Sequence, residues 1–269
     1  MKLKEYLYML GIKPKQKKYG YSVKQFDLPS FGLVEYAQWD HPSEREKEIT
    51  QENVSYLQTI INKGDFCIDI GSHSGDTTVP MALAAGLDGL VLALEPNSYV
   101  FPVLNKNAFL NTNKTNIIPL MVAATQQYED LNFEYSDSGF CNGGLHKNIS
   151  KWRHGHAFNL KVSGVDLSDV LKNKFQSRLP SLRYIKIDAE GFDLYVLQSI
   201  SDIVEQYRPL IKAEIFRHVD QKYRDQIYDY FENINYKVYK VDNEENYKGQ
   251  KLKKSDMSNW EHYDIYATP

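Results

Sequence analysis

The chain has 269 residues, a formal net charge of −3 and an isoelectric point near 6.2. This length suits one large α/β domain and is short for two. The charge gives no electrostatic footprint for nucleic acid, so we expect no nucleic-acid partner. Two cysteines are too few for the disulfide framework of a small secreted domain. We therefore expect both to be reduced and the protein to be cytoplasmic, with no signal peptide and no membrane span.

The N-terminal part is predicted to precede the main domain. Residues 1–48 alternate weakly between polar and apolar positions without a sustained period, and we interpret them as an N-terminal arm. Residues 49–269 are predicted to form the main domain. It begins with a helix over residues 50–62, capped by Thr50, which places Val54 and Leu57 on one apolar face.

Residues 66–75 contain the most informative motif. Phe66–Ile70 is an apolar run typical of a strand buried on both faces, and a turn bracketed by Gly71 and Gly75 leads into a helix from residue 77 to residue 85. The pattern is D-x-G-x-x-x-G, so neither a dinucleotide fingerprint nor a P-loop is present. Asp69 at the strand end would repel a pyrophosphate but suits a ligand with an ammonium and a sulfonium group. S-adenosylmethionine is such a ligand.

A second buried strand, residues 90–94, ends at Glu95. A carboxylate at this position can accept hydrogen bonds from both ribose hydroxyls of a nucleoside, although it could instead cap the following helix, which extends to about Asn111. The third strand, residues 116–124, ends in two alanines that could face an adenine ring or pack under a helix. The candidate cofactor-binding residues are Asp69, Gly71, Ser72, His73, Gly75, Thr78, Glu95, Pro96, Asn97, Ala123 and Ala124.

Residues 125–165 are predicted to form a β-hairpin insertion, with strands over residues 131–135 and 158–162 around glycine-rich turns. His154 and His156 lie two residues apart and would share one face of a strand. They could contribute to a metal site, but no further ligand spacing supports one. We interpret them as solvated loop histidines and predict no metal site.

The second half of the chain repeats β-α units. Strands are predicted over residues 182–188, 210–216, 236–241 and 263–267, and helices over residues 165–174, 192–206 and 220–233. Such units form a parallel, right-handed sheet covered on both faces. The last two strands have no helix between them, so they should pair antiparallel.

Residues 184–193 read YIKIDAEGFD, and this block resembles the K-I-D-x-E-G-[FY]-[DE] signature of the FkbM-type methyltransferases. The likeness extends from about Asp65 to Tyr266. It implies a class I methyltransferase fold (Rossmann-like) with a doubly wound seven-stranded sheet. It also implies S-adenosylmethionine as the methyl donor and, usually, O-methylation of a sugar, glycan or other small hydroxylated metabolite.

A hydroxyl acceptor must lose its proton as the new bond forms. The candidate catalytic residues are Asp188, Glu190, Glu214 and His218. Asp188 lies at the carboxyl tip of the fourth strand and is the preferred base, although it could instead interact with the next helix, and Glu214 could form a core ion pair. A magnesium ion held by Asp188 and Glu214 is a further alternative, as in catechol-type enzymes, but two protein oxygens are few for a hard cation. We therefore expect metal-independent chemistry.

Two other functions remain open at this point. A non-catalytic nucleoside-binding or scaffold module would keep the same fold and cofactor residues. A nucleotide-dependent oxidoreductase is disfavoured because the turn lacks a third glycine. The sequence does not reveal the acceptor or the oligomeric state.

Overall fold

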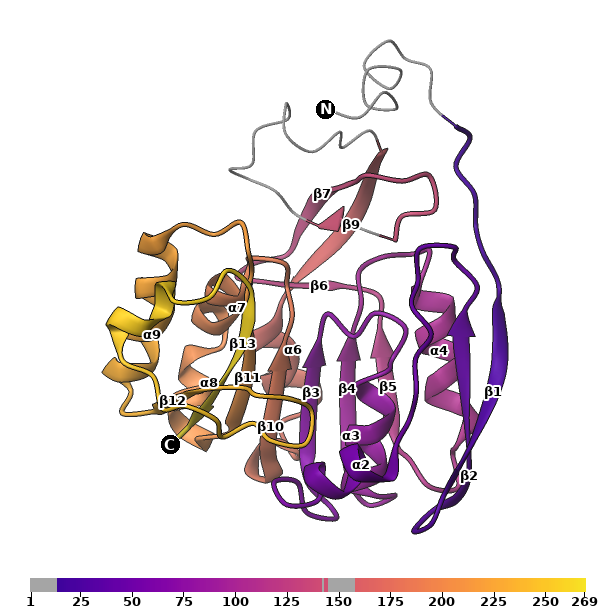
Figure 1. The fold of residues 1–269 in the computed structure, drawn as a ribbon, viewed down its shortest axis with the longest axis horizontal. Coiled ribbons are helices and arrows are strands. Elements are labelled where there is room, and N and C mark those ends of the chain that lie inside the picture. Colours follow the sequence, from indigo (N-terminus) through magenta and orange to yellow (C-terminus); the bar gives the residue numbers. More distant parts are fainter. Residues whose placement is uncertain (1–13, 142, 145–157) are drawn as a thin grey trace.

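A seven-stranded sheet forms the centre of the molecule (Figure 1). The computed structural model describes residues 14–141, 143–144 and 158–269. In spatial order the strands are β12 (Lys237–Lys240), β13 (Tyr263–Thr268), β11 (Leu210–Ile215), β10 (Leu182–Ile187), β3 (Phe66–Ile70), β4 (Leu90–Leu94) and β5 (Ile117–Leu120). All run parallel except β13, which is antiparallel to both of its neighbours. The predicted doubly wound sheet with an antiparallel last strand is confirmed.

The direction of winding reverses between β3 and β10, which lie side by side. From β3 the chain builds towards β5 at one edge, and from β10 it builds towards β12 at the other. Ile70 of β3 pairs with Ile187 of β10 and with Leu94 of β4, so these three strands end side by side at the same edge of the sheet. Ligands of open α/β sheets bind in the crevice at such a reversal, outside the carboxyl ends of the strands.

Helices cover both faces of the sheet and give each face its own apolar core. In β3, Phe66, Ile68 and Ile70 pack in one core, and Cys67 packs in the other. This explains the uninterrupted apolar runs, because a strand buried on both faces has no polar side. The first core contains α6 (Leu167–Lys174), α7 (Asp193–Ser199), α8 (Ser201–Tyr207) and α9 (Gln221–Asn233), and the second contains α2 (Gln51–Leu57), α3 (Thr78–Ala85) and α4 (Phe101–Leu110). Among the described residues, no helix is both long enough and apolar enough to cross a membrane.

Two helices differ from the sequence prediction. The cap of α2 is confirmed, since Thr50 Oγ1 accepts the Asn53 N–H at 3.2 Å, but the helix ends at Leu57. The single helix expected over residues 192–206 is wrong, because it breaks at Ile200 into α7 and α8. The hydroxyls of Ser199 and Ser201 donate to carbonyls three residues earlier, and such bonds compete with the helical ladder.

The expected third strand also divides in two. β5 ends at Leu120, and β6 (Ala123–Thr125) leaves the central sheet to pair with β9 (Phe158–Asp166). The hairpin of β7 (Glu129–Tyr135) and β9 is confirmed, but it belongs to a four-stranded sheet that also includes β6 and β8 (Gly143–Gly144). Figure 1 shows this second sheet beyond the carboxyl ends of the central strands. His154 and His156 lie outside the described residues.

The N-terminal arm is more regular than its sequence pattern indicated. Residues 21–39 form an antiparallel hairpin of β1 (Tyr21–Leu28) and β2 (Gly32–Trp39), which lies beside α4 in Figure 1. Val34 and Tyr36 of β2 are fully buried in the core that also contains α2 and α3. The weak alternation in the sequence did not define these two strands. A domain boundary at residue 48 stays a prediction.

Two asparagines of α4 bind the backbone of β2. Asn107 accepts the Ala37 N–H at 2.6 Å and donates to the Ala37 carbonyl at 2.9 Å. Asn111 makes the same two bonds with Glu35, at 3.0 and 2.8 Å. Asn107 also donates to the Ser74 carbonyl at 2.8 Å, so it connects the hairpin to the glycine turn after β3.

Candidate active site

A cavity of about 530 Å³ opens at the carboxyl ends of the central strands. Its volume is within the range of about 300–1,000 Å³ that is usual for small-molecule sites. The predicted site residues that line it are Gly71, His73, Glu95, Pro96, Asn97, Ala123, Ala124, Asp188 and Glu190. The predicted residues that do not line it are Asp69, Ser72, Gly75, Thr78, Glu214 and His218. The roles of both sets stay predictions, but only the first set can touch a ligand in this cavity.

Glu95 has a carboxylate that is fixed by two backbone N–H groups. His73 donates to its Oε2 and Asn97 to its Oε1, each at 2.8 Å. A carboxylate has about four lone-pair sites, so two remain for ligand hydroxyls. Burial raises the pKa of Glu95, against the opposing effects of His73 and of the two N–H donors. The contact with Asn97 resembles a cap, yet Glu95 still faces the cavity.

Gly71 is required by contact between two strand ends. Its φ is +75°, and a Cβ at this position would lie 1.9 Å from the carbonyl oxygen of Asp188. The atom that excludes a side chain at this position therefore belongs to the backbone of the residue that follows β10. Asp188 also donates its N–H to the Ile70 carbonyl at 3.0 Å, so the ends of β3 and β10 hold each other in place.

Asp69 is fully buried and lies behind the cavity wall. Its Oδ2 accepts the hydroxyls of Thr77 and Thr78 at 2.8 and 2.6 Å. Ser72, also buried, donates to the carbonyls of Asp69 and Leu94. These bonds hold the start of α3, and Thr77 itself lines the cavity. Asp69 therefore supports the wall from behind.

Lys186 lines the cavity, and the sequence analysis gave it no role. Its Nζ lies 3.2 Å from Asp188 Oδ2 and 3.7 Å from Asp69 Oδ1. Burial alone would lower the pKa of Lys186, but the negative charges of Asp188, Asp69 and Asp76 outweigh it and raise the pKa well above its ordinary value. A lysine inside an apolar strand, two residues before an aspartate, was the available signal for this pair.

The turn after β10 has an unusual backbone. Glu190 has φ +51° and Gly191 has φ +93°. Asp193, which is fully buried, accepts the N–H groups of Ala189 and Gly191 at 3.4 and 3.2 Å and so stabilises the turn. Glu190 is exposed to solvent and also lines the cavity, and burial and then the charge of Asp188 raise its pKa to about 7. The same two causes raise the pKa of Asp193 to about 8.

Glu214 on β11 lies outside the cavity lining. His262 Nε2 is 3.4 Å from its Oε1, whereas its Oε2 is buried and accepts no hydrogen bond from the described residues. Burial, and then the charges of Asp188 and Asp193, raise the pKa of Glu214 above its ordinary value of 4.5. His218, beyond the same strand, packs edge to face on Phe216 and also lies outside the lining.

We expect Glu214→Gln to stabilise the protein at pH 8 but not at pH 5. A group whose pKa is raised by folding binds its proton more tightly in the folded state, so the stability of the parent falls as pH rises above 4.5. Glutamine does not ionise, so the variant does not lose this stability as the pH rises. The gain at pH 8 should be about 1–3 kcal/mol, the usual cost of a buried polar group without a partner. Denaturant unfolding at both pH values measures it.

The control is Glu52→Gln on the exposed side of α2, which should change stability at neither pH. An equal effect of Glu214→Gln at pH 5 and pH 8 would contradict the interpretation. If the variant also loses methyl transfer while it is folded and binds cofactor, Glu214 acts in catalysis despite its place behind the cavity.

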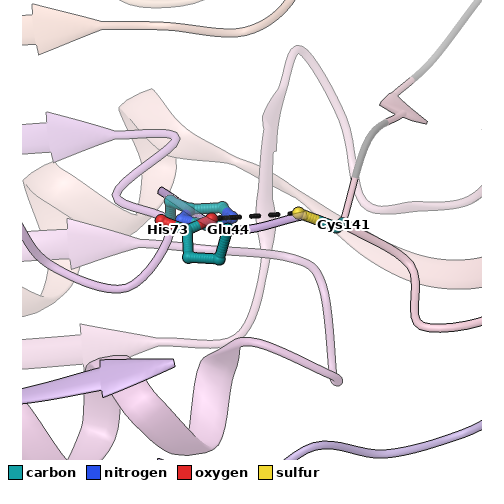
Figure 2. Close-up of side chains that lie close together, drawn as sticks. All are labelled: Glu44, His73 and Cys141. Atoms are coloured by element: carbon teal, nitrogen blue, oxygen red, sulfur yellow. Dashed lines mark hydrogen bonds and ion pairs between the residues drawn. The ribbon is translucent and has the colours of Figure 1, made fainter. Parts of the chain in front are cut away.

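Further walls of the cavity come from segments outside the sequence motifs. The loop after β2 contributes Ser43, Glu44, Arg45 and Lys47, and the second sheet and its loop contribute Leu131, Phe133, Tyr135, Cys141 and Gly143. One group of three potential metal ligands has its donor atoms within 4.8 Å of one another in the described part of the chain, and it consists of Glu44, His73 and Cys141 (Figure 2). No sequence spacing pointed to this group.

A protein-family model matches the chain. The family model described as the methyltransferase FkbM domain matches residues 69–239. No protein with curated annotation matches the chain.

Solved structures with a similar arrangement share little sequence with the chain. A methyltransferase FkbM from Methylobacillus flagellatus aligns with 11% identity and a TM-score of 0.46 over 81% of this chain, which spans only 51% of that protein. An O-methyltransferase from Bacillus cereus in complex with SAH aligns with 11% identity and a TM-score of 0.43 over 84% of each chain. Fibrillarin from Aeropyrum pernix with bound S-adenosyl-L-methionine aligns with 11% identity and a TM-score of 0.42 over 94% of this chain and 97% of that chain.

The family match covers more than half of the chain and both strand ends that frame the cavity, those of β3 and β10. The chain therefore belongs to the FkbM family of S-adenosylmethionine-dependent methyltransferases.

Proposed function

We propose that this protein transfers a methyl group from S-adenosylmethionine to a hydroxyl of a sugar, glycan or other small hydroxylated metabolite. The observation that carries the proposal is the placement of two carboxylates, Glu95 and Asp188, on the wall of one cavity at the ends of different strands. Glu95 suits the ribose hydroxyls of a nucleoside, and Asp188 suits the proton that the acceptor hydroxyl loses.

The donor side is proposed to lie over β3, β4 and β6. Glu95 has free lone pairs for the ribose hydroxyls, and its position is fixed by the N–H groups of His73 and Asn97. Val122, Ala123 and Ala124 line the same cavity with small apolar side chains that leave room for a flat ring.

The acceptor side is proposed to lie over the turn after β10. The Asp188 side chain is 42% exposed, in contrast to the fully buried Asp69, and Lys186 holds one of its oxygens at 3.2 Å. Asp188 then accepts the hydroxyl proton as the oxygen attacks the methyl group of the sulfonium, and the demethylated donor leaves with the bonding electrons. Most of the rate enhancement would come from alignment, for which oriented reactions gain about 7–11 kcal/mol.

The charges in the cavity favour a neutral or weakly charged acceptor. Each of its three lysines is paired with carboxylates: Lys47 with Asp76 at 2.7 Å, Lys186 with Asp188, and Lys212 with Glu244 at 2.7 Å. With Arg45, the lining has four basic side chains against seven acidic ones, so the cavity does not favour a polyanion. A nucleic-acid substrate is not part of this proposal.

The location that we propose is the cytoplasm, with both cysteines as free thiols.

Isothermal calorimetry tests the donor site. We expect the parent to bind S-adenosylmethionine and its demethylated product, and Glu95→Gln to bind both about 10–100-fold more weakly. Hydrogen bonds to a charged group contribute about 1.5–3 kcal/mol, and the glutamine amide would also face backbone N–H groups. The control Glu52→Gln changes an exposed glutamate on α2 and should leave the affinity unchanged. Binding of NADH without binding of either donor species would contradict the proposal.

A further inference from the structure

Three side chains with different metal-binding atoms meet at one wall of the cavity (Figure 2). Glu44 comes from the loop after β2, His73 from the turn after β3 and Cys141 from the loop after β7. Glu44 Oε2 lies 3.8 Å from His73 Nε2 and 3.8 Å from Cys141 Sγ. Ligands around a tetrahedral zinc ion, with metal bonds of about 2.0–2.3 Å, lie roughly 3.3–3.6 Å apart.

We propose that Glu44, His73 and Cys141 form a binding site for a divalent cation of the zinc class. Sulfur and imidazole ligands favour zinc or cobalt over magnesium or calcium, which prefer oxygen. Three protein ligands leave one position of a tetrahedral ion for water or for a group in the cavity, since all three residues line it. This arrangement is that of an open site, in contrast to the four protein ligands of a structural zinc.

Glu44 presents a nearly buried carboxylate to the other two ligands. Its side chain is only 6% exposed. Oε2 faces His73 and Cys141, whereas Oε1 lies 3.5 Å from Lys47 Nζ and accepts no hydrogen bond from any described residue. A buried carboxylate normally needs a cation, and a metal at Oε2 together with Lys47 at Oε1 would balance its charge.

The local charge also suits a dication. With Cys141 as a thiolate, Glu44, Asp76 and Cys141 carry three negative charges against the single positive charge of Lys47. A thiol binds a metal as the thiolate, so metal binding would release the Cys141 proton.

The ligands are held in place by contacts that do not depend on a metal. Asp137 accepts the Cys141 N–H at 3.1 Å and lies 3.1 Å from His41 Nε2, so the loop after β7 is tied to the segment that carries Glu44. The His73 ring packs edge to face on Trp39. The backbone N–H of His73 meanwhile binds Glu95, which places the proposed metal next to the proposed ribose site.

Cobalt titration of untagged, chelator-treated protein tests the site without acceptor or methyl donor. We expect one equivalent of Co²⁺ per chain, with a thiolate-to-cobalt charge-transfer band in the near ultraviolet, and displacement of the cobalt by Zn²⁺. Cys141→Ser should abolish the band and weaken cobalt binding by more than about tenfold, since even changes beyond the direct ligands cost 10–100-fold. Glu44→Gln should weaken binding but keep the band.

The matched control is Cys67→Ala, which removes the other thiol of the chain, buried in β3, and should leave the spectrum and affinity unchanged. Two results would overturn the proposal. One is cobalt binding without the charge-transfer band. The other is equal binding by the parent and Cys141→Ser, which would direct attention to other ligands such as His154 and His156. Neither result depends on whether the protein binds S-adenosylmethionine, so failure of this site and failure of the proposed function remain distinguishable.

Discussion

Replacing Asp188 by asparagine is expected to leave the affinity for S-adenosylmethionine nearly unchanged and to lower turnover by about 10²–10⁴-fold, the range for a positioned general base. Asparagine keeps the shape of the side chain but cannot accept a proton at neutral pH. The donor contacts that we propose, centred on Glu95, lie at the end of another strand. Labelled methyl donor and a panel of glycans, nucleotide sugars and hydroxylated metabolites identify the acceptor, on which turnover is then measured.

Magnesium and a control variant separate the alternatives for Asp188. If Asp188 is a direct base, added magnesium should not change the turnover of the parent. Turnover that depends on magnesium would instead favour an ion held by Asp188. Full turnover of Asp188→Asn would show that the carboxylate only positions the turn after β10. Asp27→Asn, at an exposed position of β1, serves as the control and should alter neither binding nor turnover.

Lys186→Met should destabilise the folded protein by about 3–5 kcal/mol, the usual cost of removing one partner of a buried ion pair. Asp69 would lose the nearby cation that faces its Oδ1, an oxygen that is buried and accepts no hydrogen bond from the described residues. Asp188 would also lose its contact at 3.2 Å, so turnover should fall as well. Urea unfolding measures the first effect, and the methyl-transfer assay measures the second.

A surface lysine provides the comparison. Lys254 pairs with Asp229 at 2.7 Å, but both side chains are more than 40% exposed, so Lys254→Met should cost much less stability than Lys186→Met. In a Lys186→Met background, Asp69→Asn should restore part of the lost stability, because the uncompensated charge is then gone. If Lys186→Met costs no more than Lys254→Met, the buried pair does not stabilise the protein.

The central strands could be predicted from the sequence because burial on both faces produces continuous apolar runs. The antiparallel pairing of β12 and β13 followed from the lack of a helix between them. The hairpin of β1 and β2 could not be predicted in the same way. Its strand β1 alternates in burial only from Lys24 to Leu28, and β2 is almost wholly buried beyond Leu33, so the pair lacks the sustained alternation of half-buried strands.

The candidate site was predictable to the extent that it follows from strand ends. Glu95 and Asp188 each come directly after a buried strand, and both line the cavity. Asp69 lies within β3 on the face of Cys67, which packs under α3, so its carboxylate meets the threonines of that helix start. The group of Glu44, His73 and Cys141 depends on how three loops fold together, which no local spacing encodes.

Asn107 and Asn111, in α4 and at its C-terminal end, have a consequence for the solubility of the N-terminal hairpin. An unpaired strand edge is a template for association with other chains. A carboxamide can present one N–H donor and its C=O acceptor side by side, as a peptide group does, and its second N–H stays available for another acceptor. Four residues of helix rise about 6 Å and two residues of strand about 6.6 Å. Asn107 and Asn111 can therefore match Ala37 and Glu35 in register and occupy the edge of β2 as a neighbouring strand would. The asparagines of α4 and its C-terminal cap thus cover this edge, and Asn107 also holds the glycine turn after β3.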